Sequence, residues 1–380
     1  MKNISSHAAT KIPALDHLRA LAIILVFLFH YRLFAHPDWI DTIGSFGWTG
    51  VDLFFVLSGY LISSQVFGLL QQGRFSVRDF FIKRAFRILP AYLTILFLYF
   101  SMPGFREWES LPPLWKFLTF TQNFGLDLRY HRTFSHAWSL CIEEQFYFLF
   151  PLGIMILIYF KVGKKTAYLL LLLFIIGFIS RLFCWEKFIV PAIDSDTFGV
   201  LWYKWIYYPT FNRLDAIVIG ICIAYISAYL PTLKLRIEKY TNLVLATGFV
   251  LITAAWFLCA DPYTFTASIF GFPLIALAYG FMVMAGSYGG NLLNKYTSRV
   301  TSVIAALSYS IYLTHKAAIH FAQGLSEKFG MERDSTSMFF LCIIVSIVMA
   351  IILRLVIELP FLKIRKFLLA KRKPVVYSSL

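Results

Sequence analysis

Long apolar stretches alternate with short polar connections along nearly the whole chain of 380 residues. A membrane-spanning helix needs about 20 mostly apolar residues, and ten stretches approach that length. Because a backbone in lipid must satisfy its hydrogen bonds internally, each stretch is predicted to be an α-helix. The approximate limits are residues 18–35, 46–70, 88–102, 138–160, 166–184, 211–230, 241–259, 264–286, 301–321 and 338–358.

This pattern predicts an all-α membrane helix bundle with about ten transmembrane helices. Its expected divisions are a short tail over residues 1–14, a membrane domain over 15–360 and a basic tail over 361–380. No apolar segment followed by a cleavage site precedes the first stretch, so we expect no removable signal peptide.

The composition excludes the main alternatives to a membrane protein. Hydrophobic residues make up 59% of the chain and charged residues only 14%, whereas soluble domains are about a quarter charged. Such an apolar chain does not fit intrinsic disorder either. The five cysteines are scattered and show neither metal-site spacing nor a disulfide framework, so no metal is expected.

The net charge of +15 has a different meaning in a membrane protein than in a soluble one. A basic soluble protein suggests nucleic acid as a partner, but Lys and Arg in a membrane protein gather in cytoplasmic loops. With the N-terminus inside, the inner connections hold about twice as many Lys and Arg as the outer ones. We therefore predict that both termini are cytoplasmic and that nucleic acid is not a partner.

The first apolar stretch carries two ionisable side chains, and such groups inside a membrane are costly and usually functional. Arg19 and His30 are eleven residues apart, so they share a helix face about 16 Å apart along the axis. Arg offers a permanent cation, and His can take up and return a proton near neutral pH. The alternatives are an Arg that extends to the membrane surface and a His bonded to a nearby carbonyl.

The second stretch contains a carboxylate and several small residues in the segment FGWTGVDLFFVLSGYLISS. Asp52 is a candidate for holding a cationic partner or a histidine tautomer, and the alternative is a structural ion pair. Ser58 is expected to bond back to a carbonyl of its own helix. Glycines in this segment permit close helix approach.

A basic cluster begins the third stretch, in the segment FIKRAFRILPAYL. Lys83, Arg84 and Arg87 lie close together, and the i,i+3 spacing of the two arginines lets them grip one phosphate group. The alternative is a positive anchor that contacts anionic lipid.

The segment HAWSLCIEEQFYFLFP opens the fourth stretch with two adjacent carboxylates. Glu143 and Tyr147 are i,i+4 neighbours, whereas Glu144 points about 100° away. One carboxylate is thus expected to face a cavity, where it could act as an acid or a base, and the other is expected to pair with a structural Arg. Trp138 and Tyr147 suit an interface or a wall on which sugars stack.

Two further segments carry polar residues into the bundle. In LSYSIYLTHKA, Ser308, Tyr312 and His315 form one stripe of a helix, with His315 as a second base, a ligand of the substrate or a satisfied interior histidine. Arg213 and Asp215 at the start of the sixth stretch are expected to form a salt bridge with each other.

Five of these segments together resemble the acyltransferase 3 family of bacterial membrane O-acyltransferases. They are LDHLRALAIILVFLFH, GVDLFFVLSGYLI, FIKRAFRILPAYL, HAWSLCIEEQFYFLFP and LSYSIYLTH, in family order from residue 15 to residue 315. The resemblance implies the stand-alone form, without an esterase-like domain, in the bacterial cytoplasmic (inner) membrane.

The resemblance also implies a reaction and its participants. The donor is expected to be acyl-CoA, usually acetyl-CoA, and the acceptor a hydroxyl of a cell-surface carbohydrate such as lipopolysaccharide O-antigen, exopolysaccharide or a lipid-linked saccharide. Arg19 and His30 match the family's Arg–His motif, and Arg84 and Arg87 match its Arg-x-x-Arg motif, which is associated with the donor.

The residues and the resemblance together give a set of expected site residues. The catalytic set is His30, Arg19, Asp52 and Glu143; the donor-binding set is Lys83, Arg84 and Arg87; and the acceptor-binding set is Trp138, Tyr147, Tyr312 and His315. A multi-span transporter or flippase remains the alternative, because proton-coupled transport also uses buried acids and histidines. Transporters often show two related halves, and no such internal repeat is visible in this sequence.

Overall fold

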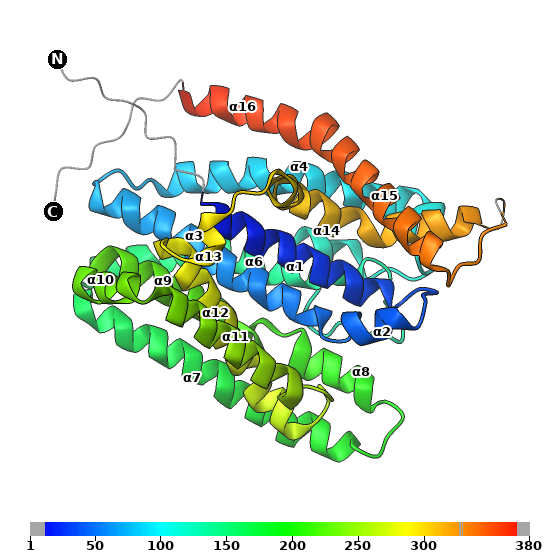
Figure 1. Ribbon diagram of the computed structural model, residues 1–380, viewed down its shortest axis with the longest axis horizontal. Helices are drawn as coiled ribbons and strands as arrows, with labels where there is room; N and C mark the ends of the chain where they lie inside the picture. The colour runs from blue at the N-terminus through cyan, green and yellow to red at the C-terminus, as the bar shows by residue number, and fades with distance from the viewer. Residues whose placement is uncertain (1–11, 327, 329, 371–380) are drawn as a thin grey trace.

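The computed structural model describes residues 12–326, 328 and 330–370, and this part of the chain is helical without a strand (Figure 1). The predicted all-α class is therefore confirmed. Most of the predicted tail over 1–14, and residues 371–380 of the predicted basic tail, lie outside the described residues. The rest of that basic tail, up to Ala370, is helical.

Each predicted apolar stretch overlaps one long helical segment. These segments are α1 (Pro13–Tyr31), α3 (Gly50–Gln71), α4 (Val77–Ser101), α6 (Trp138–Tyr159), α7 (Thr166–Cys184), α9 (Leu214–Tyr229), α11 (Thr241–Leu258), α12 (Phe272–Tyr288), α14 (Arg299–Ser326) and α15 (Thr336–Leu353), which continues through a π-helical turn (Arg354–Glu358) into α16 (Leu359–Ala370). The shorter helices are α2 (Trp39–Gly44), α5 (Leu114–Leu118), α8 (Phe198–Trp202), α10 (Pro231–Lys239) and α13 (Leu292–Lys295).

Seven helices among the described residues are long and apolar enough to cross a membrane, and an eighth is added if α9 and α10, bent by 106°, form one span. The chain is thus an integral membrane protein. Helices α4 and α14 have 25 and 28 residues, but charged and polar side chains lower their hydropathy. The count of ten spans and the cytoplasmic termini stay predictions.

Helices α1 and α14 lie side by side near the centre of the bundle, with α3 and α12 against α1 and α15 against α14. Figure 1 shows the beginning of α1, the α3–α4 turn and the end of α16 at one end of the molecule. Helix α2 and the α14–α15 turn lie at the opposite end. The predicted site residues therefore sit on the helices that form the middle of the bundle.

Two glycines let α3 and α9 pack backbone against backbone. A Cβ atom on Gly59 would lie 2.4 Å from the Ile217 carbonyl oxygen, and one on Gly220 would lie 2.3 Å from the Val56 carbonyl oxygen. The hydrophobic effect does not drive helices together in lipid, so small residues that permit close van der Waals packing are important there. This contact fixes α3, which carries part of the site.

Replacing Gly59 with Ala should therefore destabilise the protein. The added methyl group forces α3 and α9 apart, at a cost of about 1–3 kcal/mol. Gly68→Ala is the matched control on the same helix, because no atom lies within 4 Å of its Cβ position. Thermal unfolding in detergent should show a lower melting temperature for Gly59→Ala only; equal values for both variants would contradict the close contact.

Candidate functional site

A central cavity of about 160 Å³ lies between α1, α3, α4, α6 and α14. Its ionisable lining comes from four helices and consists of Arg19, Arg84, Arg87, Glu143, Glu144, Tyr147, Tyr309 and Tyr312. The sequence places these residues on separate segments, and the fold brings them into one space.

Three guanidinium groups give this cavity its positive charge. Arg84 donates from Nη2 to Gln65 Oε1 at 2.9 Å, and its guanidinium carbon lies 5.5 Å from the centre of the Tyr147 ring. In the described part of the chain, no ion pair involves Arg19, Arg84 or Arg87. Guanidinium groups held in this way suit an anionic or strongly polar ligand.

Glu143 is held by two hydroxyl groups. Its Oε1 accepts from Ser58 Oγ at 2.8 Å, and its Oε2 accepts from the Tyr147 hydroxyl at 3.2 Å. The expected back-bond of Ser58 is therefore wrong, because a carboxylate across the α3–α6 contact is a stronger acceptor than a helix carbonyl. Glu143 and Glu144 both line the cavity, so the expected division of the two between a cavity and a structural Arg does not hold.

His30 faces a second histidine rather than lipid. Its Nδ1 lies 3.0 Å from Nε2 of His315, and only 8% of the His30 residue is exposed. Nδ1 of His315 lies 2.9 Å from the Tyr312 carbonyl oxygen, so in the neutral ring that nitrogen carries the proton. Nε2 of His315 then accepts from Nδ1 of His30, which leaves Nε2 of His30 as the basic nitrogen.

A third histidine, His136, completes the cluster and was missed by sequence reasoning. Its ring centre lies 4.9 Å from that of His315 and 5.8 Å from that of His30. It is 1% exposed, and neither ring nitrogen has a hydrogen-bond partner among the described residues. The sequence signal was weak because His136 stands just outside an apolar stretch.

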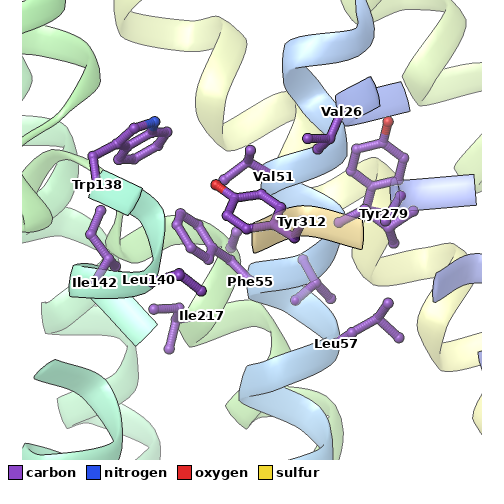
Figure 2. Packing of buried hydrophobic residues seen from close by; sticks show 14 of the residues in the cluster. Val26, Val51, Phe55, Leu57, Trp138, Leu140, Ile142, Ile217, Tyr279 and Tyr312 are labelled. Carbon is purple, nitrogen blue, oxygen red and sulfur yellow. The ribbon is translucent and has the colours of Figure 1, made fainter. Parts of the chain in front are cut away.

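Tyr312 lies between the cavity and the histidine cluster. Its hydroxyl donates to the His136 carbonyl oxygen at 2.7 Å and accepts from the Ser139 hydroxyl. Tyr312 and Ser139 line the cavity, whereas His30 and His315 do not. Figure 2 shows the Tyr312 and Phe55 rings, which both line the cavity. The centre of the Tyr312 ring lies 5.6 Å from that of His136 and 5.9 Å from that of His315, so Tyr312 also contacts the histidine cluster.

Asp52 is engaged in a buried ion pair outside the cavity. Both of its carboxylate oxygens lie 2.9 Å from Nη2 of Arg213, and the two side chains are almost completely buried. Asp215 pairs instead with Arg181 of α7. The expected Arg213–Asp215 salt bridge is therefore wrong, because the two side chains point from α9 toward different neighbouring helices.

Trp138 belongs to the wall of this ion pair rather than to the cavity. The Arg213 guanidinium carbon lies 5.7 Å from the centre of the Trp138 ring and 4.2 Å from that of Phe272. Trp138 is 3% exposed and packs edge-on against Phe55 (Figure 2). The structure thus places Asp52 and Trp138 outside the lining of the central cavity.

An open pocket of about 690 Å³ lies on the connection between α4 and α6. Its lining includes Arg106, Trp108, Arg129, Tyr130, Arg132 and His320. Glu107 also lines it and forms a fully buried ion pair with Lys316, with 2.8 Å between Oε1 and Nζ. Lys316 follows His315 in the sequence, so this pair connects the pocket to the histidine cluster.

Charge at the rim of this pocket is only partly balanced. Hydrogen bonds from Arg129 lower the pKa of the Asp127 carboxyl, so these two groups neutralise each other. Arg132 donates to the Leu128 carbonyl and lies over the Trp108 ring at 5.3 Å. Trp108 and Tyr130 remain 43% and 63% exposed, and flat rings of this kind suit sugar faces.

Among the described residues, no group of three His, Cys, Asp or Glu side chains is placed to hold a metal ion.

The comparisons with known proteins identify the family. The family model for the acyltransferase domain of acyltransferase 3 proteins matches residues 12–355. The chain therefore belongs to the acyltransferase 3 family, and the resemblance drawn from its sequence is confirmed. No solved structure matches the chain.

Three curated relatives are proteins named O-acetyltransferase OatA, from Staphylococcus aureus strains NCTC 8325 / PS 47, COL and MRSA252. Each is 27% identical over 327 residues, which cover 82% of this chain and 51% of the relative. The chain thus spans about half the length of the curated relatives it matches.

Arg213→Ala should be far more damaging than loss of an exposed Arg. Removing Arg213 leaves the Asp52 carboxylate buried without a partner, which costs about 3–5 kcal/mol. Arg32→Ala is the control, because Arg32 pairs with an exposed Asp41 and such pairs contribute about 0–1 kcal/mol. Equal melting temperatures for the two variants in detergent would contradict this account.

Proposed function

We propose that this chain is a membrane O-acetyltransferase. It moves an acetyl group from cytoplasmic acetyl-CoA to a hydroxyl of a cell-surface carbohydrate, such as lipopolysaccharide O-antigen, exopolysaccharide or a lipid-linked saccharide, in the bacterial inner membrane. Family membership and the names of the relatives support the reaction class. The observation that carries the proposal is a cavity lined by guanidinium groups that form no ion pair in the described part of the chain, with Tyr312 between this cavity and the His30–His315 pair.

The size of the central cavity supports a thioester donor with a narrow arm. About 160 Å³ corresponds to roughly five water molecules, which is too little for a nucleotide but suits the end of a narrow chain. The thiol end of the pantetheine arm of CoA, built from β-alanine and cysteamine, is such a chain, and the arm has two amides that need polar partners. Arg19, Glu143 and Tyr147 supply these partners, while Lys83, Arg84 and Arg87 lie toward the phosphates.

His30 is the catalytic base in this proposal. Its Nε2 takes the proton from the acceptor hydroxyl, and the hydroxyl oxygen attacks the thioester carbonyl carbon. As the carbon–sulfur bond breaks, the imidazolium returns the proton to the departing CoA sulfur. His315 holds the His30 ring in the required tautomer through the Nδ1–Nε2 hydrogen bond.

Arg19 acts on the donor arm rather than on the reacting carbonyl. Eleven helical residues separate it from His30 by about 16 Å along the axis of α1, so the two side chains do not reach one carbonyl group together. Glu143 also acts on the donor arm. Asp52 contributes by positioning α3 and α9 through its ion pair with Arg213.

The acceptor approaches from the opposite end of the bundle. The pocket beside the Glu107–Lys316 pair offers exposed Trp108 and Tyr130 rings for sugar faces. Tyr312 contacts the acceptor, and His315, whose two ring nitrogens bond the Tyr312 carbonyl and His30, acts on the acceptor hydroxyl through His30. For the donor and acceptor to meet, the Tyr312 side chain moves aside and breaks its bond to the His136 carbonyl.

His30→Ala should abolish transfer of radiolabelled acetyl from acetyl-CoA to glycan by purified protein, while the protein stays folded and inserted. The reason is loss of the imidazole that takes the hydroxyl proton in this proposal. His17→Ala, on the same helix near its N-terminal end, should keep most of the activity. Near-normal transfer by His30→Ala would remove His30 from the mechanism.

Arg19→Ala should raise KM for acetyl-CoA about tenfold or more, because a hydrogen bond to a charged group contributes about 1.5–3 kcal/mol, and should change kcat less. Steady-state kinetics with varied acetyl-CoA measures both values. A fall in kcat at unchanged KM would instead put Arg19 at the reacting carbonyl.

Removal of the gene from cells tests the proposed reaction as a whole. Mass spectrometry of surface glycans should show loss of one acetyl substituent per modified unit when the gene is removed. Unchanged glycans, together with solute transport by the reconstituted protein, would favour a transporter instead.

A further inference from the structure

A basic cavity of about 640 Å³ lies where α16 packs against α4. Its charged lining comes from both helices, with Lys83, Arg84 and Arg87 from α4 and Arg365 and Lys366 from α16. None of the described residues that line it is acidic. A concentration of five cations without a carboxylate suits a ligand with several negative charges.

This basic cavity adjoins the central cavity. Arg84 and Arg87 line both, so one ligand can place a charged head in the basic cavity and a narrow arm in the central one. Cavities that hold ligands of nucleotide size have about 300–1,000 Å³. The basic cavity falls in this range, and the central cavity does not.

Helix α16 is positioned to meet the aqueous phase. The continuous helical segment Thr336–Ala370 has 35 residues, which is about 52 Å at the helical rise, whereas a bilayer core is about 30 Å thick. Nη1 of Arg365 donates to the Lys83 carbonyl oxygen at 3.4 Å, which joins the ends of the two helices. Helix α16 also lies beyond residue 355, where the family match ends.

We infer that Arg365 and Lys366 of α16 bind the phosphates of the nucleotide end of the acyl donor. They complete a site that Lys83, Arg84 and Arg87 begin on α4. This inference rests on the proposed function, because it takes CoA as the donor, and it adds a second helix to the donor site. An anionic lipid headgroup presents the same phosphate chemistry and is the competing source.

The test compares two variants of the full chain in phosphatidylcholine nanodiscs, where no anionic headgroup is present. Arg365→Ala/Lys366→Ala should weaken the binding of CoA, measured by calorimetry, about tenfold or more. Lys363→Ala, on the same helix but outside the cavity lining, should bind CoA as the unchanged protein does. With S-acetyl-pantetheine as donor, which lacks the nucleotide, all three proteins should transfer acetyl at equal rates.

Other outcomes separate the failure of the inference from the failure of the proposed function. Equal CoA affinity for both variants, with acetyl transfer intact, would overturn the inference alone. The inference is also wrong if the variants differ in CoA affinity or acetyl transfer only in discs that contain phosphatidylglycerol. That result would assign the basic cavity to a lipid headgroup. If the unchanged protein neither binds CoA nor transfers acetyl, both the inference and the proposed function are wrong. Melting temperatures of the variants control for misfolding.

Discussion

The cost of holding charge inside an apolar bundle is the constraint on which the rest of this structure depends. Three carboxylates are neutralised by direct, buried ion pairs, namely Asp52 with Arg213, Asp215 with Arg181 and Glu107 with Lys316. The first two pairs join helical segments, and the third joins the α4–α6 connection to α14, so their charges are used within the scaffold. Arg19, Arg84 and Arg87 form no ion pair with any residue that the structure describes, and they line cavities instead. Pairing thus separates the charges that hold the scaffold from the charges that suit a ligand.

This separation gives the bundle two compartments. On one side of Tyr312 lies a cationic cavity with Glu143 held by Ser58 and Tyr147. On the other side lie three histidines, and the residue after His315 is Lys316, which pairs with Glu107. In the reaction that we propose, a thioester and a hydroxyl that arrive from opposite ends would be kept apart until Tyr312 moves. Such a barrier limits loss of the acyl group to water.

The sequence predicted the helices well because apolar length is a local property. The stripe of Ser308, Tyr312 and His315 was equally visible, since its spacing belongs to one helix. The partners of Asp52 and Asp215 were not predictable, because they lie 161 and 34 residues away and depend on how α3, α7 and α9 pack. His136 was missed for the same reason: its role follows only from the rings of α1 and α14 that surround it. Helix α16 looked like a basic tail because nothing local shows that it returns to α4.

The most direct test of the central claim is a cryo-electron microscopy structure with a bound, non-reactive analogue of acetyl-CoA. The account predicts the nucleotide at Arg84 and Arg87, the arm in the central cavity and the acyl end at Tyr312, pointing toward His30. An analogue bound at the opposite end of the bundle, or an acyl end directed away from the histidines, would contradict it.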